Sequence, residues 1–425
     1  MFILQEFFCL FKLILSFLSQ IIVNAVGLCY DFTIGNLYGG NFMKDHEKIR
    51  ALFPVCSKKV YLEAGLSNGG CTIAKEAMDL YFEENFNGIL EGKRQWNEAA
   101  DEVRALSASL LGGVCPDHIA ITKNTVEGIN IISQSFPFEK GDNVVINTDE
   151  HISNVMPWLA LKEKGIEVRI AKSENHRLSP DIIEKYIDKN TKIVAISHVQ
   201  APTGYKCDIK ALAEICHKNG AFLVVDAIQS LGLIPLDAKN WGIDAVASGA
   251  HKNLLSVTGV GLLYIAPQLM KLLKPQYAGS SGVRSFDRES WTNTLKDELN
   301  ARKFELSNLN YPGIYTLRAA LKFILEVGIE NIAAHVAVLS KKMNDGLREI
   351  GYHVATPANP DERAGINSVV VPDLAHMKAW FGERNIAISK MDLGFVRLSL
   401  GIFSNEEDVD IALKYARQYY EEFVK

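Results

Sequence analysis

Lys252 is the residue of this chain whose surroundings most suggest chemistry. It lies in the segment 248–255, and this segment directly follows the apolar run 245–247. A lysine at the end of a buried strand loses solvation, which favours the neutral amine over the ammonium. The neutral amine is the form that makes a Schiff base with a carbonyl group. Most lysines are solvated surface groups, so position alone leaves the ordinary surface role open.

Asp226 is a second candidate, because it ends the apolar run 222–225 and precedes a polar turn. A carboxylate inside a cleft needs a cationic partner, or its desolvation costs several kcal/mol. A protonated pyridine nitrogen would be such a partner. The alternative is that Asp226 only begins a turn or caps a helix.

His151 and Thr125 also follow expected strands and precede expected helices. The flat ring of His151 is suited to lie against a planar cofactor and to exchange protons near neutral pH, although a structural histidine would look the same. Thr125 opens a helix, whose free backbone N–H groups and dipole favour a phosphate. As a plain helix cap, Thr125 would need no ligand.

All these residues fall where expected strands end. Between residues 59 and 265 short β-branched runs alternate with amphipathic stretches, a pattern typical of a parallel sheet with crossover helices. The pattern predicts strands over residues 118–122, 143–147, 167–170, 192–197, 222–225, 245–248 and 260–265. It predicts helices over residues 126–134, 154–164, 180–188 and 209–219. In such a doubly wound α/β fold ligands bind at the carboxyl ends of the strands, so the candidates would meet there.

The chain is long enough for two domains. After residue 310 the pattern changes to long helices at 315–326, 329–350 and 406–424, with short strands at 352–355, 368–371 and 395–400. We therefore expect a large α/β domain over residues 59–310. The smaller α+β domain would combine residues 43–58 with 311–425.

Composition excludes several classes of function. The net charge of −5 gives no broad basic field for nucleic acid. Seven cysteines are scattered without a CxxC pair or a Cys/His cluster, which argues against a disulfide framework and against a metal site. We expect a reducing, cytoplasmic location.

The N-terminal extension, residues 1–42, is unusually hydrophobic. Polar residues interrupt it too often for a clear membrane span, and it lacks the basic start of a signal peptide. It is either a signal or anchor, or a mis-assigned start with Met43 as the true first residue. Contact with a membrane is expected only if the extension is retained.

Five short segments follow one another in a set order. They are 61–65 (Tyr-Leu-Glu-Ala-Gly), 124–130 (Asn-Thr-Val-Glu-Gly-Ile-Asn), Glu150-His151, 225–229 (Val-Asp-Ala-Ile-Gln) and His251-Lys252. Together they resemble the class V aminotransferase and cysteine desulfurase family of pyridoxal-phosphate enzymes, which have fold type I. The resemblance runs from about Tyr61 to the end of the chain. It implies pyridoxal 5'-phosphate as the cofactor, a small amino acid as the substrate, and a homodimer.

The resemblance also implies roles for the cofactor-binding residues. Lys252 would hold the cofactor as a Schiff base and move protons at the substrate Cα, while Asp226 would keep the pyridine nitrogen protonated. The remaining cofactor contacts would be Gln229 to the ring oxygen, His151 on the ring face, and Thr125, the Val126 backbone and His251 on the phosphate. A hydroxyl residue is usual three positions before the lysine. Gly249 stands there instead, which leaves Ser248, one position away, as the candidate.

Substrate contacts are implied in the same way. Arg397 resembles the family arginine that binds a substrate α-carboxylate, for which a guanidinium fork is well shaped. Gln200 and His198 would be neighbours of the substrate or the cofactor. The glycine-rich segment 277–284 is a candidate to complete the partner subunit's site.

The absence of a cysteine shortly before Arg397 argues against one reaction of this family, cysteine desulfuration. Cysteine desulfurases of this family carry a nucleophilic cysteine shortly before the arginine, whereas the last cysteine here is Cys216. A persulfide needs a thiol. We therefore expect an aminotransferase that uses a keto acid as acceptor. A desulfurase-like, β-lyase or epimerase activity and a non-catalytic scaffold are the alternatives.

Overall fold

The computed structural model describes residues 42–295, 299–391 and 393–425. Contacts divide the chain into two units, Met1–Lys48 and Ile49–Lys425. Helix α2 (Phe42–Ala51) crosses this division, and everything below concerns the second unit. The N-terminal extension lies outside the described residues except for Phe42.

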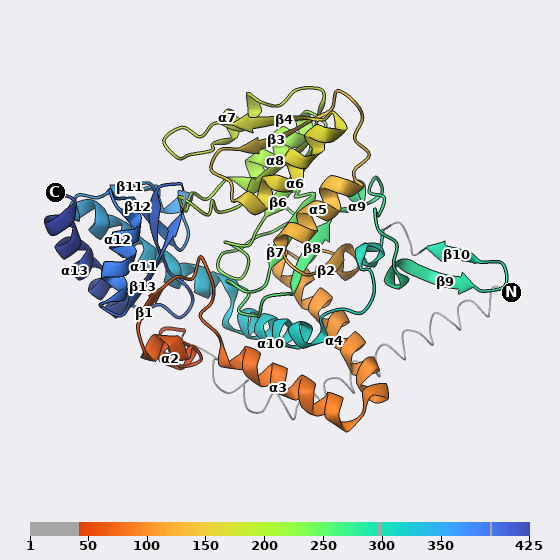
Figure 1. The fold of residues 1–425 in the computed structure, drawn as a ribbon, viewed down its shortest axis with the longest axis horizontal. Coiled ribbons are helices and arrows are strands. Elements are labelled where there is room, and N and C mark those ends of the chain that lie inside the picture. Colours follow the sequence, from red (N-terminus) through yellow and green to blue (C-terminus); the bar gives the residue numbers. More distant parts are fainter. Residues whose placement is uncertain (1–41, 296–298, 392) are drawn as a thin grey trace. The chain divides into compact units, whose positions relative to one another are not determined.

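A seven-stranded sheet lies in the second unit, with the order β2-β8-β7-β6-β5-β3-β4. Strands β3 to β7 run parallel, while β8 is antiparallel to both of its neighbours (Figure 1). The strands are β2 (Ile119–Thr122), β3 (Asn143–Asn147), β4 (Glu167–Ala171), β5 (Thr191–Ser197), β6 (Phe222–Asp226), β7 (Ala245–Gly249) and β8 (Gly261–Ile265). The predicted fold class, with a mostly parallel seven-stranded sheet, is confirmed.

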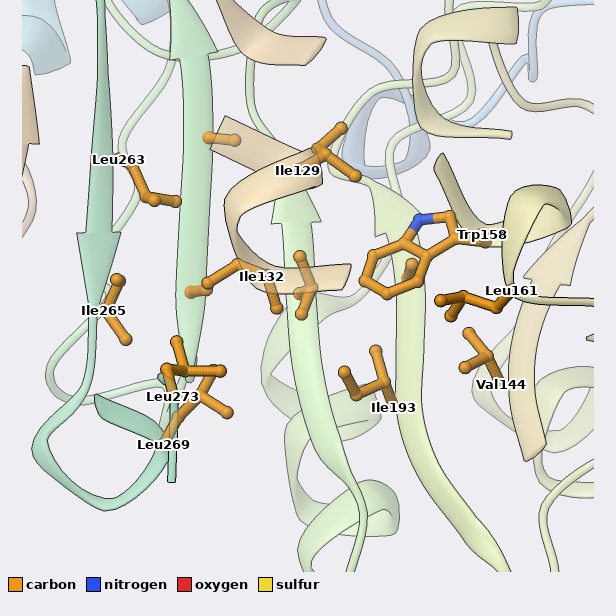
Figure 2. Packing of buried hydrophobic residues seen from close by; sticks show 14 of the residues in the cluster. Ile129, Ile132, Val144, Trp158, Leu161, Ile193, Leu263, Ile265, Leu269 and Leu273 are labelled. Atoms are coloured by element: carbon orange, nitrogen blue, oxygen red, sulfur yellow. The ribbon is translucent and has the colours of Figure 1, made fainter. Parts of the chain in front are cut away.

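One face of this sheet is covered by helix α5 (Thr125–Ser135) and by α6 (Met156–Leu159) with the 3₁₀ turn η4 (Ala160–Lys164). Figure 2 shows Ile129 and Ile132 of α5 beside Trp158, above the side chains of the strands. Burial of each such apolar side chain stabilises the folded state by about 1.5–3 kcal/mol. Helix α8 (Ile209–Lys218) packs against β6.

The helix predicted over residues 154–164 is broken into pieces. The 3₁₀ turn η3 (Ile152–Asn154) precedes α6, and η4 follows it. Pro157 lacks an amide proton, so no continuous helix can run through this position with all its hydrogen bonds. Helix α7 (Pro180–Glu184) is also shorter than expected.

Three long helices pack together beside the sheet. They are α3 (Thr72–Asn87), α4 (Ile89–Leu110) and α10 (Tyr311–Val327), and α10 contacts both of the others. Figure 1 shows α10 running beside α3 and α4. Helix α10 therefore packs against two helices that come much earlier in the sequence.

A second, five-stranded sheet has the order β1-β13-β14-β12-β11. Its strands are β1 (Val60–Leu62), β11 (His353–Val354), β12 (Ile366–Val370), β13 (Ile386–Met391) and β14 (Phe395–Ser399). Helices α11 (Ile329–Ile350), α12 (Leu374–Gly382) and α13 (Glu406–Phe423) accompany it. β1 pairs with β13, so the segment that follows β1 leads from this sheet to helix α3.

The remaining elements are short. A hairpin consists of β9 (Val283–Asp287) and β10 (Thr292–Leu295). The others are η1 (Pro54–Ser57), η2 (Pro116–His118), α9 (Pro267–Met270), η5 (Ser280–Gly282), η6 (Ala301–Phe304) and η7 (Pro360–Glu362). None of the described helices is, by itself, long and apolar enough to cross a membrane; α10 and α11, bent by 77°, pass that test only as a pair.

Candidate active site

The carboxyl ends of the parallel strands bring the main candidates together. Asp226 lies between Ser197 of β5 and Ala247 of β7 in the register of the sheet. The hydroxyl of Thr125, at the start of α5, accepts a hydrogen bond of 2.8 Å from the backbone amide of Gly249 at the end of β7. The start of α5 is therefore fixed to the strand that leads into Lys252.

Helix α5 approaches the sheet closely because Gly128 has no side chain. A Cβ atom at this position would lie 3.1 Å from the Cβ of Ala247. This distance is tighter than ordinary van der Waals contact, so a larger residue would push the helix away from the sheet. The close approach keeps the first turn of α5 beside the end of β7.

Lys252 has the surroundings expected of a reactive amine. Burial lowers its pKa below the ordinary lysine value, and the nearby positive charge of Arg397 lowers it further. Asp226 acts in the opposite direction. Since burial and Arg397 outweigh the carboxylate, a larger fraction of Lys252 is neutral near pH 8 than for a surface lysine.

Asp226 is buried and accepts a hydrogen bond of 2.9 Å from the amide of Ile228. Burial raises the pKa of this carboxyl group, and the carboxylate of Glu150 raises it too, whereas the Ile228 amide and Lys252 lower it. A carboxylate held in this way is stabilised by an added cationic group. The environment of Asp226 therefore favours a role as the partner of a protonated ring nitrogen over a role that only begins a turn.

His151 is held in one tautomer by its own turn. The ring Nδ1 accepts from the backbone amide of Ser153 at 3.2 Å, so in the neutral ring the proton lies on Nε2. Burial lowers the pKa of His151, and the positive charges of Lys252 and Arg397 lower it further. The imidazole is therefore neutral at physiological pH and has a ring N–H directed away from its turn.

Glu150 is a functional residue that our sequence analysis missed, although its dipeptide with His151 was noticed. Its buried carboxylate accepts hydrogen bonds from the amide and hydroxyl of Ser197, both at 2.6 Å. The side-chain amides of Asn147, Asn154 and Gln200 also donate hydrogen bonds to this carboxylate, at 2.7, 3.1 and 3.0 Å. One carboxylate thus joins the ends of β3 and β5 to the last residue of η3.

The predicted phosphate ligands are brought together only in part. The Asn124 side chain caps α5 by accepting from the amide of Glu127 at 2.9 Å, which leaves the amides of Thr125 and Val126 at the open end of the helix. His251 precedes Lys252, and burial lowers the pKa of its ring.

Ser248 is not brought to this phosphate end. Its hydroxyl donates to the backbone oxygen of Gly249 at 3.1 Å. Ala247 faces α5, and neighbouring residues of a strand point to opposite faces of the sheet. Ser248 therefore faces away from α5, and the expected hydroxyl contact is wrong for this residue.

Arg397 lies on β14 and is almost fully buried. Its Nε donates to the hydroxyl of Ser389, its register partner on β13, at 3.1 Å, and its Nη1 donates to the backbone oxygen of Ala201 at 2.9 Å. Burial lowers its pKa to about 10. These two anchors hold Nε and Nη1, and Nη2 remains to donate to a carboxylate. Neither anchor was predicted.

His198 and Gln200 are not brought to Arg397. The Gln200 amide is fully buried and donates to Glu150, and its role is therefore to support the site from behind. His198 packs edge-on against Trp241, with ring centroids 5.9 Å apart, and lines a different cavity. Because Ser197 faces Glu150, the next residue along the chain faces the opposite side of the sheet. The expected substrate contact of His198 is thus wrong.

His176 is another residue that was missed. It lies with Asn175 in a two-residue turn, at φ angles of 61° and 51°, which are unfavourable for side chains other than glycine. Its ring is edge-on to Phe395 at 5.1 Å, and its Nδ1 is 3.7 Å from Asp149. Phe395 shares a face of β14 with Arg397. His176 therefore connects the segment before His151 to the strand that carries Arg397.

Three buried thiols, those of Cys71, Cys207 and Cys216, are poorly suited to nucleophilic attack. Cys71 lines a cavity of about 420 Å³ together with His251, but burial raises the pKa of this thiol to about 11. Burial also raises the pKa of Cys207 and Cys216 well above the ordinary value. The thiolate is the nucleophilic form, and it would be scarce at neutral pH in all three.

Comparisons with known proteins identify the family. The family described as Aminotransferase class-V matches residues 71–412. An uncharacterized aminotransferase of Schizosaccharomyces pombe is 30% identical over 321 residues, which cover 75% of this chain and 81% of that protein. A probable cysteine desulfurase of Methanothermobacter thermautotrophicus is 32% identical over 308 residues, which cover 70% and 74%.

A solved structure shows the same fold. The apo structure of a cysteine desulfurase from Thermococcus onnurineus matches with a TM-score of 0.80 and 25% identity, over 88% of this chain and 98% of that chain. The family match covers most of the sequence and includes every candidate residue discussed above. The chain therefore belongs to the class-V aminotransferase family.

Proposed function

We propose that this protein is a pyridoxal-phosphate-dependent aminotransferase that acts on a small amino acid. The observation that carries the proposal is the convergence of three groups: the amine of Lys252, the buried carboxylate of Asp226 and the anchored guanidinium of Arg397. When bound, pyridoxal phosphate supplies an aldehyde that condenses with amines and a ring that withdraws electrons from the substrate Cα. The class-V family is a family of pyridoxal-phosphate enzymes.

The residues present fit this cofactor. Asp226 would stabilise the positive charge of a protonated ring nitrogen, and the neutral ring of His151 would lie on the ring face. The first amides of α5, at Thr125 and Val126, would hold the phosphate. The Oε1 atom of Gln229 is buried without a hydrogen-bond partner among the described residues, while its amide group donates one proton to Gly65. A second amide proton of Gln229 is free to donate to a ring oxygen.

Substrate binding and proton transfer would be carried out by the side chains of Arg397 and Lys252. Arg397 would bind the substrate carboxylate and so orient the Cα–H bond toward Lys252. The neutral amine of Lys252 would then remove the Cα proton and return a proton at a different carbon, which is what distinguishes transamination from racemisation. The support of His151 by Ser153, and of Ser197 by Glu150, keeps these groups in place during the transfer.

Aminotransfer is favoured over desulfuration by the same geometry. β13 ends at Met391 and β14 begins at Phe395, so the connection between them spans only residues 392–394 and contains no cysteine. The desulfurase alternative is favoured by one observation, which is the shared cavity of Cys71 and His251. Since the Cys71 thiol is protonated near neutral pH, we rank this activity second.

The partners proposed for this reaction are an amino acid, a keto acid as acceptor and a second copy of the chain. Segment 277–284, which contains η5, would complete the second subunit's site. A cytoplasmic location and a membrane contact through residues 1–42 also remain proposals.

A direct assay tests the proposed function. The purified protein is incubated with pyridoxal phosphate, alanine and an α-keto acid, and in parallel with cysteine alone, and the new amino acid and the released sulfide are measured. We expect a new amino acid that is lost in Lys252→Ala. Sulfide production that is lost in Cys71→Ala would instead establish the desulfurase alternative. Absence of both products, together with failure to bind the cofactor, would refute an enzymatic role.

A further inference from the structure

Segment 201–203 (Ala-Pro-Thr) is held by three side chains from the region of the five-stranded sheet. Its three consecutive backbone oxygens each accept a hydrogen bond. The bonds run from Arg397 Nη1 to Ala201 at 2.9 Å, from Ser368 Oγ to Pro202 at 2.6 Å, and from Thr356 Oγ1 to Thr203 at 2.5 Å. All three donor side chains are buried. A buried carbonyl that loses its donor is costly, so these bonds fix the segment in place.

Ser368 and Arg397 are direct neighbours in the five-stranded sheet. They are register partners on the antiparallel strands β12 and β14, so their side chains lie on the same face. The backbone amide of Ser368 donates to the hydroxyl of Thr356 at 2.8 Å, and this hydroxyl donates in turn to segment 201–203. The three donors therefore form one connected group, and a displacement of the segment would disturb all three bonds together.

The preceding residue, Gln200, connects the same segment to the cofactor side of the site. Its side chain donates to the carboxylate of Glu150 at 3.0 Å. Glu150 also accepts from Ser197, whose register partner is Asp226. The segment therefore joins the strand ends near Asp226 to the strand that carries Arg397.

Gly204 allows a close approach between this segment and β12. Its φ of 75° lies in the left-handed region that favours glycine. A Cβ atom at this position would lie 2.5 Å from the backbone oxygen of Ile366, which is far shorter than van der Waals contact. The turn at Gly204 and the three hydrogen bonds therefore hold the segment at a fixed distance from β12.

We infer that Ser368 and Thr356 are positioning residues for the substrate carboxylate. Their hydroxyls hold segment 201–203, and the Ala201 oxygen of this segment anchors the guanidinium of Arg397. Both residues act through Arg397 rather than on the reacting atoms. A shift of about 1 Å in a group that orients the substrate can cost about 100-fold. The inference rests on the proposed function, since it requires a substrate whose carboxylate binds Arg397.

The test measures binding of alanine, and of ethylamine, which is alanine without its carboxylate. Both are titrated into the full-length holoprotein, and binding is followed by the change in absorbance of the bound pyridoxal phosphate. In Ser368→Ala the oxygen of Pro202 loses its donor, and we expect the Kd for alanine to rise by about tenfold. The Kd values for ethylamine and for the cofactor should stay unchanged, because neither molecule uses Arg397. An equal loss for alanine and ethylamine would indicate a purely structural role and would overturn the inference.

Thr356→Val should have the same selective effect, because it removes the hydroxyl that bridges Ser368 and segment 201–203. Thr356→Ser retains that hydroxyl and should bind alanine as the wild type does. If Thr356→Ser lost as much affinity as Thr356→Val, the hydroxyl would not be responsible and the inference would be wrong. If Thr356→Val does not fold, Ser368→Ala decides the question alone.

Ser340→Ala is the matched control for removal of a buried hydroxyl. Ser340 lies on α11, is 1% exposed and accepts from the side chain of Asn367 at 3.3 Å. Asn367 precedes Ser368 on β12, so its side chain lies on the opposite face of the sheet. Affinity for alanine should stay unchanged in Ser340→Ala. A loss as large as that in Ser368→Ala would point to a general effect of destabilising this region and would contradict the inference.

Two further comparisons separate the inference from the proposed function. In the Arg397→Gln background, Ser368→Ala should cause no further loss of alanine affinity, since its effect passes through Arg397. An additional loss of about tenfold would mean that Ser368 acts independently, and the inference would be rejected. A wild-type protein that bound neither alanine nor ethylamine would refute the proposed function, and the inference with it. Alanine binding by the wild type that is unchanged in Ser368→Ala would overturn the inference alone.

Discussion

The hydroxyl of Thr125 accepts a hydrogen bond of 2.8 Å from the backbone amide of Gly249. This contact joins the proposed phosphate end of α5 to the strand that leads to Lys252. One side chain therefore fixes the distance between the two ends of the cofactor site. Its removal should affect both stability and cofactor binding.

We expect Thr125→Val to lower the free energy of unfolding by about 1–3 kcal/mol, because the buried Gly249 amide loses its acceptor. Affinity for pyridoxal phosphate should fall about tenfold or more, measured by titration of the absorbance of the bound cofactor. Thr125→Ser retains the hydroxyl and is the matched control. If Thr125→Val bound the cofactor as tightly as the wild type, the proposed role of this contact would be wrong.

Removal of the Glu150 charge should loosen the support behind the site. Its carboxylate accepts from Ser197, Asn147, Asn154 and Gln200, and an amide in its place would turn a donor toward other donors. We expect Glu150→Gln to lower the free energy of unfolding by about 1.5–3 kcal/mol in chemical denaturation.

The matched control for this variant is Glu349→Gln, at an exposed position of α11, which should change stability by less than about 0.5 kcal/mol. The pH profile of activity should also shift in Glu150→Gln, because the Glu150 charge raises the pKa of Asp226. A profile identical to that of the wild type would limit Glu150 to a purely structural role.

Arg397→Gln should raise KM for an amino-acid substrate by about 10 to 100-fold, since a charge-assisted hydrogen bond to the carboxylate is lost. The matched comparison is a simple primary amine that has no carboxylate. Its slow reaction should be the same in both proteins. An equal loss for the amine would mean that Arg397 acts on the fold of the site and not on the substrate.

Stability should depend on pH through His217. Its Nε2 lies 2.9 Å from Asp244, and this hydrogen bond raises the pKa of the imidazole, with burial acting in the opposite direction. A raised folded-state pKa contributes stability that is fully present below the unfolded pKa of about 6.5 and is lost as pH rises through the folded value.

The free energy lost in His217→Gln should therefore be larger at pH 5.5 than at pH 8.5, as measured by denaturation in urea. The matched control is His353→Gln, at an exposed position of β11 that has no ion-pair partner among the described residues. A loss for His217→Gln that is the same at both pH values would contradict the assignment.

The strands of the large sheet were predictable because parallel strands buried on both faces are continuous apolar runs, such as Phe222–Asp226. The residues at the ends of these runs, Asp226 and Lys252, followed from that pattern. β13 was missed because its alternating segment was taken as the loop before Arg397. Glu150 was missed because Ser197 and Gln200, two of its partners, are distant in sequence. Ser389 was missed because its contact with Arg397 depends on the pairing of β13 with β14, which was not predicted.

The errors at Ser248 and His198 have a common cause. Both residues lie at the ends of strands, where a shift by one residue moves a side chain to the opposite face. The sequence places a residue near a strand end but does not determine which face it occupies. His176 was missed for another reason: its role depends on a left-handed turn that is more often formed with glycine.

The hairpin of β13 and β14 has a consequence for how this scaffold changes over evolution. Met391 and Phe395 remain paired at its end, so the ladder that carries Ser389 and Arg397 is complete before the turn is reached. Additional residues inserted at this turn would leave the carboxylate-binding arginine in register. The tip is therefore a natural insertion point, where a new catalytic side chain can be gained or lost while substrate binding is preserved.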